Sequence, residues 1–145
     1  MVKSHLSSFL GLVLLTGCAA GQAVAETASE RATAHFQAIG QGQLDVVTAA
    51  YTDASTFQWI GGPLDGEYKG KSAIAEVWRK FTAAQGKLEV AVANVTENGN
   101  PKGSTVTADV MFKGKKTIPV RYVLTYRGAD LVTEIWQIDP KLAQY

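Results

Sequence analysis

The chain contains a single cysteine, Cys18, and only two histidines. One cysteine excludes a disulfide within the chain, and the sequence has no C-x-x-C or H-x-x-x-H spacing of the kind that zinc sites use. The longest apolar stretch, Leu6 to Leu15, is too short to cross a bilayer as a helix. The sequence therefore predicts neither a metal site nor a bound cofactor.

An excess of charge of one sign is also absent. The chain has 14 basic and 13 acidic side chains, and without Lys3 the two counts are equal at 13. Such a chain has no general attraction for nucleic acid or for an anionic surface. Nucleic-acid binding is therefore not expected, and Lys113, Lys115 and Lys116 around Gly114 are interpreted as a solvated hairpin tip.

The N-terminal residues have the pattern of an export signal, because Lys3 precedes the apolar stretch. The tetrapeptide Leu15-Thr16-Gly17-Cys18 resembles a bacterial lipobox, in which the cysteine is lipidated and becomes the N-terminus. We therefore predict a signal peptide over 1–17, a tether over 18–26, and a lipid at Cys18 that anchors an extracytoplasmic domain to a bacterial membrane. The alternative is ordinary cleavage after Ala25, which would leave a soluble periplasmic or secreted protein.

The stretch GGPLDGEYKGKS, residues 61–72, ends like a phosphate-binding loop. The motif G-x-x-x-x-G-K-S/T wraps backbone N–H groups around phosphates. Counting back from Gly70 places Asp65 where the first glycine belongs, and a carboxylate there would repel phosphate. The glycines are therefore interpreted as a sharp hairpin whose backbone passes close to the next helix.

Hydrophobic periodicity divides the rest of the chain into helices and strands. Residues 27–39, 44–51 and 72–81 have helical spacing, the last segment with Ser72 as its N-cap. Residues 56–61 alternate as a strand does, and further strands are expected at 88–95, 105–112, 118–126 and 131–138. Helices followed by an antiparallel meander indicate one α+β domain over residues 27–145.

Several segments, taken in order, resemble the nuclear transport factor 2-like superfamily, and within it the SnoaL-like branch that is related to ketosteroid isomerases. These segments are Gly42-Gln43-Leu44, Ala50-Tyr51-Thr52-Asp53-Ala54, Trp59-Ile60-Gly61-Gly62-Pro63, the helix at 73–81 and Glu134-Ile135-Trp136-Gln137. The resemblance implies a cone of strongly curved antiparallel sheet wrapped around the N-terminal helices, as in a cystatin-like α+β barrel. It also implies an apolar pocket in the cone and homodimers across the outer face of the sheet.

Two ionisable residues, His35 and Glu134, are the candidates for acid–base chemistry. His35 lies on the apolar stripe of the first helix, where a histidine also occurs as an ordinary boundary residue. Glu134 shares a face of the last strand with Trp136, so an inward face would desolvate its carboxylate and suit it to proton transfer. If Ile135 faces the core instead, Glu134 is a solvated surface residue.

Five aromatic residues are candidates to line a pocket, although aromatic side chains at such spacings are also common core residues. They are Tyr51, Trp59, Tyr122, Tyr126 and Trp136. The resemblance implies, for a ketosteroid isomerase, a helix tyrosine, an aspartate base and a second, protonated aspartate. Near those positions this chain has His35, then Gln58 or Trp59, then Tyr122. Neither an amide nor an indole replaces a carboxylate base, so ketosteroid isomerase activity is not expected.

Three functions follow from this pattern. The first is a ligand-binding or accessory lipoprotein that holds a small apolar ligand without catalysis. The second is a SnoaL-like isomerase, cyclase or dehydratase that transfers protons through His35 and Glu134, or with Asp65. The third is an interaction module that uses the outer sheet face. An enzyme predicts that His35 and Glu134 meet within hydrogen-bond reach in a pocket, whereas a binding protein predicts an apolar pocket without such a pair.

Overall fold

The computed structural model describes residues 24–144, which form three α-helices, six strands and a short 3₁₀ helix. The expected export signal and Cys18 lie outside the described residues, so the lipid anchor stays a prediction. No helix within residues 24–144 is long and apolar enough to span a membrane. The helices are α1 (Ala28–Gln41), α2 (Leu44–Ala49), α3 (Lys71–Gln85) and η1 (Pro140–Gln144).

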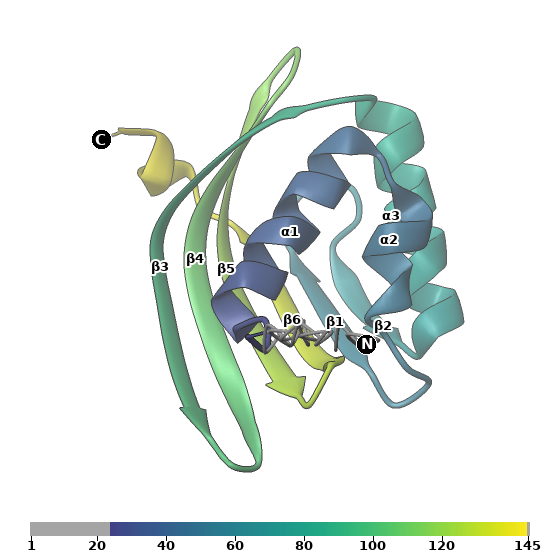
Figure 1. The fold of residues 1–145 in the computed structure, drawn as a ribbon. Helices are drawn as coiled ribbons and strands as arrows, with labels where there is room; N and C mark the ends of the chain where they lie inside the picture. The colour runs from purple at the N-terminus through teal and green to yellow at the C-terminus, as the bar shows by residue number, and fades with distance from the viewer. Residues whose placement is uncertain (1–23, 145) are drawn as a thin grey trace, which may run out of the picture.

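The six strands form one curved sheet in the order β2-β1-β6-β5-β4-β3. Their bounds are β1 (Thr56–Ile60), β2 (Gly66–Lys69), β3 (Glu89–Asn100), β4 (Gly103–Lys113), β5 (Thr117–Arg127) and β6 (Asp130–Ile138). The sheet wraps around α1, with α2 and α3 on the same concave side and η1 on the convex side (Figure 1). The α+β class and the curved sheet are confirmed.

Two details of the sheet differ from the expected antiparallel barrel. Strand β1 pairs with β6 in parallel, while every other described pair is antiparallel. The direction of β6 is set by its hairpin with β5, and in this direction it runs alongside β1, which the chain has left 70 residues earlier. The sheet is also open, because β2 and β3 have no partner on their outer sides among the described strands.

A capping box fixes the start of α1. The Glu30 backbone N–H donates to Thr27 Oγ1 at 3.1 Å, and the Thr27 backbone N–H donates to Glu30 Oε2 at 2.7 Å. This second bond lowers the pKa of the Glu30 carboxyl. The next residue ties the helix to the sheet, because the Ser29 N–H donates to Glu97 Oε2 at 2.8 Å. These contacts hold the first turn of α1 against the far end of β3.

The glycine-rich segment between β1 and α3 forms a turn over residues 61–65, followed by strand β2. Gly61 and Gly62 have φ of 98° and 77°, and the Gly61 N–H donates to Asp65 Oδ1 at 2.7 Å. The Gly61 N–H, which a phosphate-binding loop would offer to its anion, is therefore already bonded to the Asp65 carboxylate. Helix α3 begins at Lys71 after Gly70, without a side-chain cap, so the expected N-cap at Ser72 is wrong. Gly70, at φ 79°, donates its N–H to the Ser55 carbonyl instead.

The interior of the cone is packed with aromatic rings. Trp59 of β1 stacks on Trp136 of the neighbouring β6, with ring centroids 4.4 Å apart. Trp78 of α3 stacks on Phe57 at 5.1 Å. Such rings bury large apolar areas and fix their neighbours' positions. The cone is therefore filled from α3 across to β6, and room for a ligand exists only where this packing ends.

At Gly40, α1 lies close against the start of β3. A Cβ atom there would overlap the Val90 side chain and lie 2.9 Å from the Leu88 carbonyl oxygen. The Leu88 N–H already donates to the Gly40 carbonyl at 2.7 Å, so the two backbones cannot separate without losing this bond.

We predict that Gly40→Ala destabilises the fold by about 1–3 kcal/mol, because overcrowding outweighs the better helix propensity of alanine. Urea unfolding followed by tryptophan fluorescence measures the change. The matched control is Gln37→Ala, on the exposed side of the same helix, which should change stability by no more than about 0.5 kcal/mol. A Gly40→Ala protein as stable as this control would refute the close contact.

Candidate functional site

His35, Tyr51, Trp78 and Glu134 meet in the interior and form a buried polar cluster. The Tyr51 hydroxyl donates to Glu134 Oε2 in a short hydrogen bond. His35 Nε2 lies 3.3 Å from Glu134 Oε1 and 3.4 Å from the Tyr51 oxygen. Trp78 Nε1 donates to that same oxygen at 3.0 Å. The cluster therefore joins α1, the residues after α2, α3 and β6 around one carboxyl group.

The inward orientation of Glu134 settles the choice between the two faces of β6. Glu134 has no exposed surface, so the interpretation as a solvated residue is wrong. The strand alternates, with Glu134 and Trp136 buried, whereas Ile135 is only partly buried. A buried carboxyl is tolerated only when donors satisfy it, and Tyr51 and His35 lie in position to do so.

Burial and the charge of Glu134 act together on the tyrosines of this region. Burial, and then the nearby Glu134 carboxylate, raise the pKa of Tyr51 and of Tyr122 well above the ordinary tyrosine value. Both hydroxyls therefore stay protonated at neutral pH. Because the folded-state pKa lies above the unfolded one, the free energy of unfolding falls as pH rises above about 10, where these tyrosines ionise more readily in the unfolded chain.

A cavity of about 500 Å³ opens where the end of α3 meets the β4–β5 turn. We call it the mouth cavity. Its lining is mainly apolar, with three lysines at its polar part. The lining residues are Trp59, Pro63, Leu64, Lys80, Phe81, Ala84, Gln85, Lys115, Lys116, Ile118 and Ile138. None of the four residues of the buried polar cluster is among them.

A second cavity, of about 320 Å³, lies beside His35 at the other end of β5. We call it the His35 cavity. Its lining includes Arg31, Val46, Ala49 and Tyr126. Arg31 lies over the Tyr126 ring, 5.0 Å from its centroid, as a cation–π pair. His35 is 6% exposed here, so one member of the buried polar cluster reaches a cavity, while Glu134 stays behind it.

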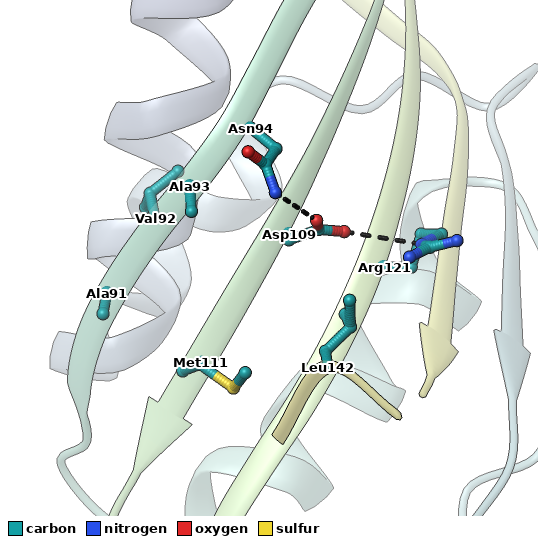
Figure 2. A pocket seen from close by; sticks show the side chains of 8 residues that line it. All are labelled: Ala91, Val92, Ala93, Asn94, Asp109, Met111, Arg121 and Leu142. Atoms are coloured by element: carbon teal, nitrogen blue, oxygen red, sulfur yellow. Dashed lines mark hydrogen bonds and ion pairs between the residues drawn. The ribbon is translucent and has the colours of Figure 1, made fainter. Parts of the chain in front are cut away.

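A groove of about 540 Å³ lies on the convex face of the sheet, and Figure 2 shows its lining. Asn94 Nδ2 donates to Asp109 at 2.8 Å, and Arg121 Nε lies 3.4 Å from Asp109 Oδ1 (Figure 2). A bulge after Ala93, with Asn94 at φ 52°, shapes this groove. The polar groups of the groove satisfy one another, which disfavours it as a small-ligand site. The homodimer expected across this face stays a prediction.

The structure distributes the five aromatic candidates over different places. Trp59 lines the mouth cavity, and Tyr126 lines the His35 cavity. Tyr51 belongs to the buried polar cluster, while Tyr122 and Trp136 pack in the interior against each other at 5.4 Å. No group of three or more metal-ligating side chains occurs within residues 24–144.

Sequence reasoning missed two sets of residues. The sequence predicts only that Trp78 lies in the helix at 72–81, and nothing in its spacing indicates that its N–H bonds a tyrosine 27 positions away. Lys115 and Lys116 were interpreted as a solvated hairpin tip, although this tip lies over the mouth cavity. The only feature of the sequence that indicates a role for Lys115 and Lys116 is that these two lysines are adjacent and have no acidic neighbour.

Tyr51 and Tyr122 are both fully or almost fully buried, but only Tyr51 has hydrogen-bond partners among the described residues. We predict that Tyr51→Phe destabilises the protein by about 2–3 kcal/mol, since Glu134 loses a donor and Trp78 loses an acceptor inside the core. Tyr122→Phe, the matched control, should be neutral within about 0.5 kcal/mol or stabilising. Equal losses in urea unfolding at pH 7 would contradict the role given to the cluster.

Solved structures with the same fold extend over most of the chain. The chain is similar to a cystatin-fold protein of unknown function from Nostoc punctiforme, with a TM-score of 0.65 and 14% identity over 80% of this chain and 91% of that one. A nuclear transport factor 2-like protein of unknown function from Pseudomonas putida gives 0.65 and 18%, over 74% and 81%. A protein with a ketosteroid isomerase-like fold from Catenulispora acidiphila, in complex with trimethylamine, gives 0.60 and 17%, over 79% and 88%.

Identities this low establish the fold alone. No curated protein matches the chain. The model of the SnoaL-like domain, however, matches residues 32–134, which include most of α1, the whole sheet up to Glu134 and every residue of the buried polar cluster. The match covers well over half of the sequence. The chain therefore belongs to the SnoaL-like domain family.

Proposed function

We propose that this domain binds a small apolar molecule in the mouth cavity and carries out no proton transfer on it. The observation that supports this most strongly is the separation of the two sites. The mouth cavity has the volume and the apolar lining of a small-molecule site. The paired acid–base groups, His35 and Glu134, lie in the buried polar cluster outside it.

The state of Glu134 also favours binding over catalysis. Both of its oxygens have partners, Tyr51 on one and His35 on the other, and the residue has no exposed surface. A general base must come within hydrogen-bond reach of the proton that it removes. Glu134 could do so only after the cluster had opened, which would leave buried polar groups without partners.

An enzyme is the second candidate, and one observation favours it. His35 Nε2 lies 3.3 Å from Glu134, and His35 also lines the His35 cavity. A substrate there would meet the histidine edge, with Glu134 behind it as the group that orients the ring. This arrangement would support proton transfer of the isomerase or dehydratase type. The two candidates therefore place the small molecule at opposite ends of β5.

The two sites are distinguished by filling each cavity in turn. We predict saturable binding of N-phenyl-1-naphthylamine, an uncharged fluorescent probe, to the purified domain. Ala84→Trp, on the exposed side of α3 that lines the mouth cavity, should weaken this binding at least about tenfold by occupying the space. Ala83→Trp is the matched control, because Ala83 is exposed on the same helix but lines no described cavity.

A third variant makes the outcome decisive. Ala49→Trp fills the His35 cavity and should leave probe binding unchanged. If Ala49→Trp rather than Ala84→Trp abolishes binding, the ligand site lies beside His35 and the enzyme candidate is favoured. If neither variant differs from Ala83→Trp, the probe binds elsewhere and both candidate sites are wrong.

We also infer that the domain is exported and held at a membrane by a lipid on Cys18. The support is the lipobox-like Leu15-Thr16-Gly17-Cys18 directly after the apolar stretch. Mass spectrometry of the membrane-extracted protein should give a lipidated N-terminus at Cys18, and Cys18→Ala should release the protein from membranes. A free N-terminus at Glu26, or a Cys18→Ala protein that still sediments with membranes, would contradict the anchor.

A further inference from the structure

We propose that the mouth cavity is built for an amphiphile with one anionic head group, such as a free carboxylate on an apolar chain. This inference rests on the proposed function, since it names the chemical class of the ligand at the same site. Two features carry it: three lysines line an apolar cavity, and its described lining holds no acidic side chain.

The lysines come from two elements that are far apart in the sequence. Lys80 belongs to α3, while Lys115 and Lys116 form the β4–β5 turn. Three positively charged residues that line one cavity favour an anion there. This excess of positive charge is local to the cavity, because the chain from Glu26 onward has equal numbers of basic and acidic side chains.

Ion pairs with acidic side chains do not prevent these lysines from binding an anion. Among the described residues, Lys115 and Lys116 have no ion-pair partner. Lys80 Nζ lies 4.0 Å from Glu76, but Glu76 is held by Arg79 at 2.6 Å and 2.9 Å through two nitrogens. This two-point pairing is the stronger of the two contacts. Lys80 can therefore turn to a ligand without leaving a carboxylate unpaired.

Trp59, which is 4% exposed, forms part of the inner wall of the cavity. Its Nε1 is buried and has no hydrogen-bond partner among the described residues, and the same is true of Trp136 Nε1, so neither nitrogen identifies the ligand. The lysines do identify it, because an ammonium group only donates hydrogen bonds and a carboxylate only accepts them.

The apolar part of the lining selects the rest of the ligand. Phe81, Leu64, Ile118 and Ile138 present hydrocarbon surface, and Tyr68 holds Leu64 in place by donating its hydroxyl to the Leu64 carbonyl at 2.7 Å. A small inorganic anion would leave this surface wet, and an uncharged chain would leave the lysines without a counter-charge. A single-chain amphiphile with an anionic head satisfies both parts.

The test uses isothermal titration calorimetry to compare three molecules with the same ten-carbon chain: decanoate, 1-decanol and decyltrimethylammonium. The two ionic compounds are kept below their micelle concentrations, and 1-decanol is kept below its solubility limit. Decanoate is expected to bind at least about tenfold more tightly than 1-decanol, the ratio expected if each exposed lysine contributes about 0.5 kcal/mol. Decyltrimethylammonium should bind more weakly than both. The decanoate affinity alone should fall as salt is raised.

A triple variant isolates the charge from the cavity. Lys80→Gln, Lys115→Gln and Lys116→Gln together should bring the decanoate affinity down to that of 1-decanol, whose own affinity stays unchanged. The control variant changes Lys69, Lys71 and Lys102 to Gln, which removes the same net charge from residues that do not line the cavity. It should retain the tenfold preference.

The outcomes separate this inference from the function on which it rests. If decanoate and 1-decanol bind equally and Ala84→Trp weakens both, the cavity binds apolar molecules but the anion preference is wrong. If neither binds, the proposed function itself fails. If the domain sediments with phosphatidylglycerol vesicles but does not bind decanoate, the lysines recognise a membrane surface, and the proposal of a free amphiphile is overturned.

Discussion

The carboxyl group of Glu134 sits in the middle of the sheet with no exposed surface, and the arrangement of the helices depends on satisfying it. Tyr51 donates to one oxygen, His35 lies beside the other, and Trp78 completes the set through Tyr51. Helix α1, helix α3 and the residues after α2 thus each contribute one group to a single polar centre. A buried polar cluster that lacked some of its hydrogen bonds would make the fold less stable than an apolar core would. The cluster therefore fixes how the three segments pack together.

The aromatic packing that surrounds this cluster determines where a ligand can be held. Trp59, Trp78, Phe81 and Trp136 are in mutual contact and fill the cone from α3 to β6. The polar cluster lies on one side of these rings and the mouth cavity on the other. Trp59 and Phe81 belong to both the packed core and the cavity wall. The cavity is therefore lined by both buried aromatic rings and exposed lysines.

The sequence predicts much of this fold because hydrophobic periodicity is a local property. The apolar stripe of residues 27–39 and the alternation of residues 118–126 and 131–138 correspond to α1, β5 and β6. Alternation indicated that Glu134 and Trp136 share a face, but it could not say which face is buried. That choice depends on donors from Tyr51 and His35, which are 83 and 99 positions away.

Other features are not local and had no signal in the sequence. The parallel pairing of β1 with β6 follows from where the meander returns, and an expected meander alone suggests only antiparallel neighbours. Strand β3 continues to Asn100, beyond the expected residue 95, because the bulge at Asn94 bends it around the helices without ending it. The role of Lys115 and Lys116 is also not local, because it depends on the mouth cavity that these residues line.

The central claim is that a ligand enters the mouth cavity while the cluster around Glu134 remains closed. The chain has three tryptophans, and each has a different place in this account, so their indole N–H signals in a ¹⁵N–¹H correlation spectrum report on it separately. On addition of decanoate, the account predicts that the Trp59 indole signal shifts because its ring forms part of the cavity wall, while the signal of Trp78, whose N–H is bonded to Tyr51, stays in place. A shift of Trp78 with Trp59 unchanged would contradict the claim and place the ligand at the cluster.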